Sequence, residues 1–172
     1  MATPAQHPAF GYPRTMPVPA ALERHVISSS ADATRALGSA LARVAAPGDL
    51  VCLWGELGAG KTQLAKGFGA GLGVTATINS PTFVLMSEYA GRLPLFHVDL
   101  YRLAGPDEAV DGGLIDERQS AGVTVVEWPD RLGRALPEAR LDIRIDGTGE
   151  EPRTIGLRAG HPDLARYLAA IP

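Results

Sequence analysis

Residues 50–62, LVCLWGELGAGKT, decide the fold of this 172-residue chain. The first five form a short, continuous apolar run between turn residues, which is typical of a strand buried on both faces of a parallel sheet. The next eight, Gly55 to Thr62, match the phosphate-binding pattern G-x-x-x-x-G-K-[ST]. Residues 61–72 then have the pattern of a helix. A strand, a glycine-rich loop and a helix in this order predict a P-loop.

The loop carries the groups that bind a nucleoside triphosphate. Gly55, Gly58 and Gly60 let the backbone turn tightly, so that consecutive N–H groups converge on phosphate oxygens beside the positive end of the helix. Lys61 supplies a full charge for the β- and γ-phosphates, and the Thr62 hydroxyl is placed to coordinate magnesium. The alternative, a glycine-rich turn that precedes a lysine by chance, is disfavoured by the flanking elements. We therefore expect ATP or ADP, with Mg2+, to contact Glu56, Leu57, Gly58, Ala59, Gly60, Lys61, Thr62 and Gln63.

Helical and strand patterns alternate along the chain, which predicts an α/β fold. The expected architecture is a three-layer P-loop NTPase with a mainly parallel central sheet and an antiparallel C-terminal hairpin that is half exposed. Loops at the C-terminal ends of the strands are then the expected ligand site. The expected elements are a helix between Ser30 and Pro47, strands over 93–98 and 123–126, helical segments over 106–118, hairpin strands over 141–145 and 154–158, and a helix after His161.

Length and composition fit one domain. Residues 1–22 contain five prolines and are interpreted as a flexible extension, so the P-loop ATPase domain is expected over 23–172. The net charge is −3 and there is no basic stripe, which disfavours tight direct binding to nucleic acid. Cys52 is the single cysteine, no apolar run could span a bilayer, and there is no signal-peptide pattern. A cytoplasmic protein without membrane contact is expected.

A P-loop site needs a further acidic group near the metal, commonly at the end of a neighbouring strand. Asp99 and Glu127 each follow an apolar run and are candidates, although either could be a solvated or capping carboxylate at a strand end. Thr82 follows a proline in a polar segment. It could hydrogen-bond the γ-phosphate or its attacking water, or make only a turn contact. His97 and Trp128 are interpreted as packing residues.

Four motifs together resemble the TsaE family, formerly called YjeE. They are GELGAGKT at 55–62, SPTF at 80–83, HVDLYRL at 97–103 and EWP at 127–129, in the family's order and spacing. The resemblance runs from about Ser29 to about Arg158 and implies a bacterial ATPase required for the threonylcarbamoyladenosine (t6A) modification at position 37 of tRNAs that read codons beginning with A. It also implies binding to a complex of TsaD and TsaB, which ATP hydrolysis resets between catalytic cycles, and contact with tRNA through that complex.

The resemblance further implies roles for individual residues. Lys61 and the loop backbone would bind phosphates, and Thr62 and Glu127 would hold magnesium. Asp99 would serve hydrolysis or metal organisation, and Thr82 would be a switch residue. The motifs leave open how Asp99 and Glu127 divide the metal and catalytic roles. Near the positions of the family's base-side nucleotide contacts lie Ser29 or Ser30, ahead of the first helix, and Arg153, on the late hairpin.

Two other functions are compatible with a P-loop. A small-molecule kinase would transfer phosphate to a substrate hydroxyl, but it needs a substrate pocket and usually an arginine-bearing lid, which no insertion here resembles. A nucleotide-dependent binding module would present different partner surfaces in its ATP and ADP states with negligible turnover. The second function overlaps with an accessory ATPase, because weak hydrolysis without partners is expected of both.

Overall fold

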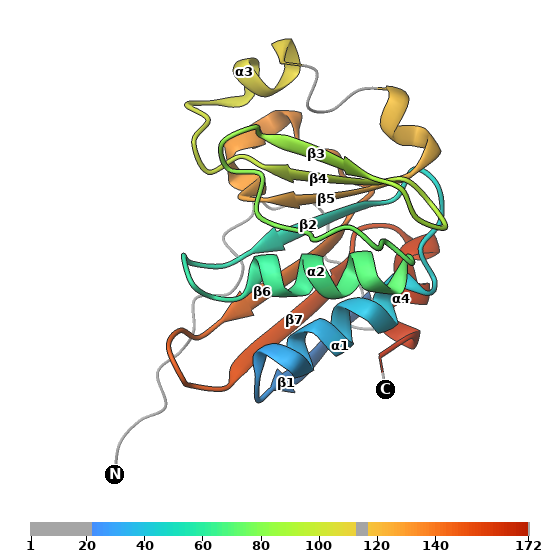
Figure 1. The fold of residues 1–172 in the computed structure, drawn as a ribbon, viewed down its shortest axis with the longest axis vertical. Helices are drawn as coiled ribbons and strands as arrows, with labels where there is room; N and C mark the ends of the chain where they lie inside the picture. The colour runs from blue at the N-terminus through green and yellow to red at the C-terminus, as the bar shows by residue number, and fades with distance from the viewer. Residues whose placement is uncertain (1–21, 113–116, 172) are drawn as a thin grey trace.

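The computed structural model describes residues 22–112 and 117–171, which form a seven-stranded sheet with helices on both faces (Figure 1). The strands are β1 (Glu23–Ser28), β2 (Leu50–Trp54), β3 (Met86–Tyr89), β4 (Leu95–Asp99), β5 (Val123–Glu127), β6 (Leu141–Asp146) and β7 (Arg153–Ala159). Their order in the sheet is β1-β7-β6-β2-β5-β4-β3. The central strands β6, β2, β5 and β4 are mutually parallel, whereas β7 and β3 are antiparallel to their neighbours. The P-loop strand β2 therefore lies in the middle of the sheet.

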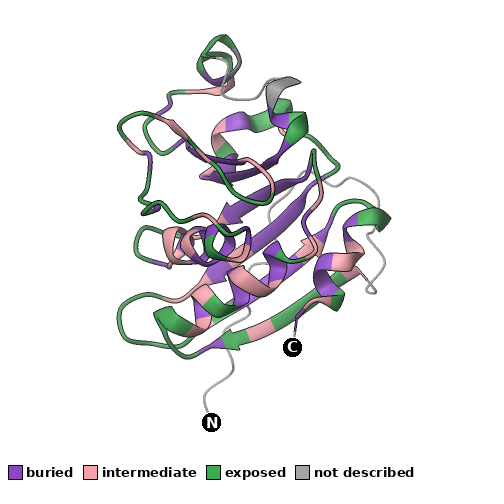
Figure 2. Cartoon of the chain, turned by 45° about the vertical axis from the view of Figure 1, so that its right-hand side comes forward, coloured by how far each residue is buried: buried purple, intermediate pink, exposed green. Residues whose placement is uncertain are grey.

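Helices of unequal size cover the two faces of the sheet. On one face α1 (Ala31–Ala42), α2 (Lys61–Gly71) and α4 (Ala165–Ala169) enclose the larger apolar cluster, and the strands between the layers are largely buried (Figures 1 and 2). On the other face α3 (Pro106–Asp111) and the 3-10 helix η3 (Pro129–Ala135) cover a smaller cluster. Two more 3-10 helices are η2 (Glu117–Ala121) and η4 (Pro162–Leu164). The expected α/β architecture is confirmed, and no helix in the described ranges is long and apolar enough to cross a bilayer.

Helices α1 and α2 pack backbone to backbone because glycines lie in their contact. A Cβ added to Gly38 of α1 would lie 2.3 Å from the carbonyl oxygen of Leu64, and one added to Gly67 of α2 would lie 2.0 Å from that of Arg35. Interiors are packed too densely to absorb such overlaps without moving the helices apart. The glycines thus hold the N-terminus of α1 beside the start of α2, where the P-loop ends.

The alternation of side chains along the strands decides which of them face α2. Val51 of β2 and Val125 of β5 belong to the apolar cluster on the α1–α2 face. Glu127 lies two residues after Val125 and therefore on the same face, and Asp99 is its register partner on β4. Both carboxylates consequently lie on the α2 side of the sheet, at the C-terminal edge where α2 begins.

Three features differ from the sequence expectations or lie beyond them. The patterns do not predict β1 or β3, which are the two edge strands and pair only with β7 and β4 in the described sheet. The β6–β7 hairpin is confirmed, and most of its alternating polar side chains are partly exposed, but Asp142 departs from the expected half exposure. It is fully buried, with its Oδ1 2.8 Å from Nε of Arg140. A buried polar position is tolerable when it is paired in this way. The expected flexible extension, apart from Leu22, lies outside the described residues.

Candidate nucleotide-binding site

The P-loop has a backbone that glycine adopts most readily. Gly55, Gly58 and Gly60 have φ angles of 143°, 81° and 112°. Space is also limiting at Gly55, where an added Cβ would lie 2.5 Å from the carbonyl oxygen of Ile145 in β6. Gly60 is the N-cap of α2 and offers no side chain to that helix end. The first N–H groups of α2 are therefore left to bind an anion.

Lys61 lies folded over its own loop. Its Nζ donates hydrogen bonds to the carbonyl oxygens of Gly55, at 2.7 Å, and Glu56, at 2.8 Å. The same atom lies 3.9 Å from the centroid of the Trp128 ring, which makes a cation–π contact. Burial lowers the pKa of the Lys61 ammonium from its ordinary value, and nearby carboxylates, Glu127 foremost, oppose that shift. The site thus holds a buried ammonium group close to carboxylates.

Thr62, Glu127 and His97 form a chain of hydrogen bonds. The Thr62 hydroxyl donates to Oε1 of Glu127 at 3.0 Å and to Oε2 at 3.3 Å. His97 Nε2 lies 2.9 Å from the same Oε1, and both its ring and the carboxylate are buried. The carboxylate on β5 is therefore bound from two sides, by the start of α2 and by the neighbouring strand β4.

Asp99 anchors the polar segment that follows α2. The hydroxyls of Ser80 and Thr82 each donate to its Oδ2 at 2.5 Å, and the backbone N–H of Tyr101 donates to its Oδ1 at 2.9 Å. Asp99 is 2% exposed, so these contacts replace most of its hydration. The carboxylate on β4 thus fixes the position of the segment that contains Thr82.

Two of the hollows beside the P-loop share part of their lining, namely Gly58, Gly60 and Gln63. The larger of the two, about 440 Å³, lies over the start of α2. We call it the phosphate hollow, because its walls include the loop and the lysine. Every side chain that the sequence assigns to phosphate binding, metal binding or catalysis lines it. These are Lys61, Thr62, Thr82, Asp99 and Glu127.

The second hollow, about 280 Å³, brings together the residues expected on the base side, so we call it the base hollow. Ser29, Ser30 and Arg153 line it, although they come from opposite ends of the chain. Arg153 Nε donates to the carbonyl oxygen of Ala59 at 2.9 Å, which ties β7 to the P-loop. The Ser30 Oγ accepts a hydrogen bond from the N–H of Ala33 at 3.1 Å and so caps α1. The two hollows thus adjoin each other across the P-loop.

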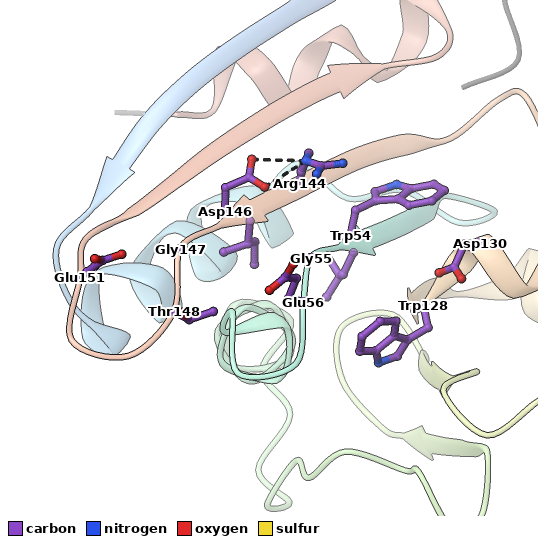
Figure 3. Close-up of a pocket in the computed structure, with 12 residues that line it drawn as sticks. Trp54, Gly55, Glu56, Trp128, Asp130, Arg144, Asp146, Gly147, Thr148 and Glu151 are labelled. Carbon is purple, nitrogen blue, oxygen red and sulfur yellow. Dashed lines mark hydrogen bonds and ion pairs between the residues drawn. The ribbon is translucent and has the colours of Figure 1, made fainter. Parts of the chain in front are cut away.

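A third cavity, about 490 Å³, opens between β2, β6 and η3 (Figure 3). Its walls carry the side chains of Glu56, Asp130, Asp146 and Glu151 against one cation, Arg144, which pairs with Asp146 at 3.0 Å. A cavity with this charge repels phosphate, so it suits a triphosphate less well than the phosphate hollow does. Because the Glu56 side chain lines the acidic cavity, its contribution to a nucleotide would come from its backbone N–H.

Comparison with known proteins identifies the family. The profile of the family described as "Threonylcarbamoyl adenosine biosynthesis protein TsaE" matches residues 28–155. The chain belongs to the TsaE family. That match spans all four motifs quoted from the sequence, and TsaE proteins take part in tRNA threonylcarbamoyladenosine biosynthesis.

Individual TsaE relatives match most of the chain. The TsaE protein of Bacillus subtilis (strain 168) is 45% identical over 127 residues, 73% of this chain and 79% of the relative. That of Streptomyces coelicolor is 46% identical over 115 residues, 65% of this chain and 78% of the relative. The crystal structure of Bacillus subtilis YdiB has a TM-score of 0.67 at 36% identity and covers 86% of this chain and 90% of its own. The fold and the family are thus shared.

The structure adds contacts that the sequence interpretation lacked. The sequence predicts only packing for His97 and Trp128, but His97 contacts Glu127 and Trp128 contacts Lys61. A signal was present in each case, because His97 lies two residues before Asp99 on the same face of a strand and Trp128 directly follows Glu127. Ser80 also reaches Asp99, although the sequence interpretation singled out only Thr82 from that segment.

Proposed function

We propose that this chain is a Mg2+-dependent ATPase that acts as an accessory protein in the t6A modification of tRNA position 37. One observation carries the ATPase proposal: the anion-binding loop, Lys61, the Thr62 hydroxyl and two carboxylates from neighbouring strands line one hollow. Loop amides and Lys61 would bind the β- and γ-phosphates of ATP, which would then replace the carbonyls of Gly55 and Glu56 as partners of the ammonium. ADP would keep most of these contacts.

The donor set of the phosphate hollow suits magnesium. Thr62 and Glu127 offer a hydroxyl and a carboxylate, the hard oxygen ligands that Mg2+ prefers. Within the described residues no group of three or more His, Cys, Asp or Glu side chains could hold a metal by itself. Magnesium is usually bound by one or two carboxylates together with substrate phosphates and water, so the absence of a full cage among these residues agrees with a Mg–nucleotide site. When bound, the ion neutralises charge that develops on the phosphates.

Asp99 and Thr82 would orient the attacking water. A hydroxyl has one hydrogen, and Thr82 donates its hydrogen to Asp99, so its oxygen, which also lies 2.6 Å from Oγ of Ser80, can only accept. This arrangement favours a contact with water, which can donate, over a contact with the γ-phosphate, which cannot. Asp99 would hold that pair in place and accept a proton from the water, while Glu127, bonded to Thr62, would serve the metal.

Membership of the TsaE family supports the biological role. We propose that the chain acts on a complex of TsaD and TsaB, that it reaches tRNA through that complex, and that its hydrolysis of ATP resets the complex between cycles. The net charge of −3 agrees with a protein partner that itself holds the tRNA. Hydrolysis by the isolated chain is then expected to be slow.

The test is ATP hydrolysis by the purified chain with magnesium, alone and with TsaD and TsaB from the same source. Stimulation by the pair supports the accessory role, and loss of the stimulated rate in Lys61→Ala assigns it to this P-loop. An equal rate with and without the pair, together with phosphate transfer to a metabolite, would instead support a small-molecule kinase. Nucleotide binding without any turnover in either condition would support a binding module.

A further inference from the structure

Among the described residues His97 has a single polar contact, and that contact is with the expected metal ligand. Its side chain is 0% exposed. Nε2 lies 2.9 Å from Oε1 of Glu127, whereas Nδ1 has no hydrogen-bond partner among the described residues. A buried polar atom without a partner costs about 1–3 kcal/mol, so an aliphatic side chain would suit a purely structural role better. His97 thus places a donor against Glu127 at the cost of an unpaired buried nitrogen.

The tautomer of His97 follows from its hydrogen bond with Glu127. An ionised carboxylate only accepts hydrogen bonds, so the hydrogen of the imidazole must lie on Nε2. The Thr62 hydroxyl donates to the same carboxylate, closer to Oε1 at 3.0 Å than to Oε2 at 3.3 Å. Oε1 is therefore the better-satisfied oxygen, and Oε2 keeps the greater capacity to bind a cation.

The orientation of the Glu127 carboxylate matters because magnesium needs its ligands in a defined geometry. The terminal torsion of a glutamate is soft and broadly distributed, so nothing in the Glu127 side chain itself fixes the plane of its carboxylate. Magnesium requires close to ideal octahedral geometry and releases its water reluctantly. Donors that hold a ligating carboxylate are thus able to change metal affinity even though they never touch the metal.

We propose that His97 is a positioning residue that fixes the Glu127 carboxylate for magnesium in the phosphate hollow. This inference rests on the proposed Mg–nucleotide function and adds a residue to it. His97 reaches Glu127 because β4 and β5 are parallel neighbours and both side chains face α2, with Val125 as the register partner of His97. The histidine acts through Glu127 and contacts neither nucleotide nor metal.

The test measures ADP affinity in excess EDTA and then as a function of magnesium concentration. We expect His97→Leu to shift the magnesium midpoint upward by about 10-fold or more, while ADP affinity in EDTA stays within about twofold of the unsubstituted chain. His97→Gln should restore most of the midpoint, because its amide N–H reaches about as far as the imidazole Nε2. His97→Asn should resemble His97→Leu, because its amide is too short. Thermal unfolding without magnesium checks that each variant folds.

Val125→Ala is the matched control, since it removes buried volume beside His97 without removing a donor to Glu127. Its magnesium midpoint should be unchanged. An unshifted midpoint in His97→Leu, an equal loss of ADP affinity with and without magnesium, or equal shifts in the Gln and Asn variants would each overturn the proposal. If His97→Leu does not fold, the Gln and Asn pair decides. If the unsubstituted chain binds ADP with no dependence on magnesium, the proposed function itself fails, which is a different result.

Discussion

The phosphate hollow and the base hollow lie on either side of the same loop, but different kinds of contact hold their walls together. In the phosphate hollow hydroxyl groups donate to carboxylates at the ends of buried parallel strands, Thr62 to Glu127 and Thr82 to Asp99. In the base hollow the main contact is between a guanidinium and a backbone carbonyl, Arg153 to Ala59. Carboxylates held by a rigid sheet suit a role in ATP hydrolysis. A contact between the loop and an outer strand suits a role in binding and orienting the nucleotide.

The largest effect should come from Asp99→Asn. If the phosphate hollow carries the chemistry, this change lowers the rate of ATP hydrolysis at saturating ATP by about 100-fold or more, because it removes the proton acceptor beside Thr82. Nucleotide affinity should change by less than about threefold, because Asp99 bonds to Ser80 and Thr82 rather than to Thr62. Steady-state hydrolysis with TsaD and TsaB present, together with equilibrium ADP binding, measures the two quantities separately.

Asp130→Asn is the matched control for Asp99→Asn. Asp130 also lowers the positive potential around Lys61, but it is exposed and lines the acidic cavity. It should leave the hydrolysis rate almost unchanged. A comparable loss in both variants would mean that the rate follows the total negative charge of the site, and Asp99 would then have no special place in the chemistry.

Lys61→Ala should have the next largest effect, on binding. Loss of a charge-assisted contact to phosphate costs about 2–3 kcal/mol, or roughly a 30–150-fold weaker ATP affinity. Isothermal titration with ATP in the presence of magnesium measures it. Lys66→Ala, on the same helix but outside the phosphate hollow, should retain normal affinity. If the two lysine variants bound ATP equally well, the assignment of Lys61 to the phosphates would be lost.

The phosphate hollow could be predicted from the sequence because the residues that specify it form short local patterns. Eight consecutive residues specify the loop, and a carboxylate at the end of an apolar run lies at the strand edge whenever the strands are parallel. The sequence therefore predicts Asp99 and Glu127 without knowledge of the strand order. The contact of His97 with Glu127 was not found, because it depends on which strand lies beside β5, and the sequence patterns do not specify neighbours in a sheet.

The residues of the base hollow could be predicted only through resemblance to a family. Ser29 follows β1 and Arg153 begins β7, and these residues meet because β1 and β7 pair with Ser28 opposite Arg153. Strand β1 has a weak pattern, with most of its side chains exposed, so its place in the sheet comes from long-range pairing rather than from its own sequence. The glycine contact between α1 and α2, which holds Ser30 near the P-loop, is likewise a tertiary feature.

Arg153→Ala should weaken nucleotide binding without slowing hydrolysis. Its guanidinium donates to backbone carbonyls of Ala59 and of the β6–β7 turn, and a net loss of about 1 kcal/mol corresponds to roughly fivefold weaker binding of ATP and ADP alike. The hydrolysis rate at saturating ATP should be unchanged. Arg134→Ala removes an exposed arginine that lies outside both hollows and is the charge-matched control. A slower rate at saturating ATP in Arg153→Ala would contradict the division between the two hollows.

The smallest effect is expected for Ser30→Ala, and it should appear in stability. The Ser30 Oγ accepts from Ala33 N–H at the start of α1, and loss of such a cap costs about 1 kcal/mol of unfolding free energy, measured by urea denaturation without nucleotide. Ser30→Gly keeps the backbone conformation of the cap, so it should lower the unfolding free energy by only about a few tenths of a kcal/mol. ADP affinity should stay within about twofold in both variants, because the hydroxyl is already engaged by the helix. If Ser30→Ala lowers the free energy of ADP binding by more than it lowers the free energy of unfolding, Ser30 is a nucleotide contact. The base hollow would then bind through side chains, as the phosphate hollow does.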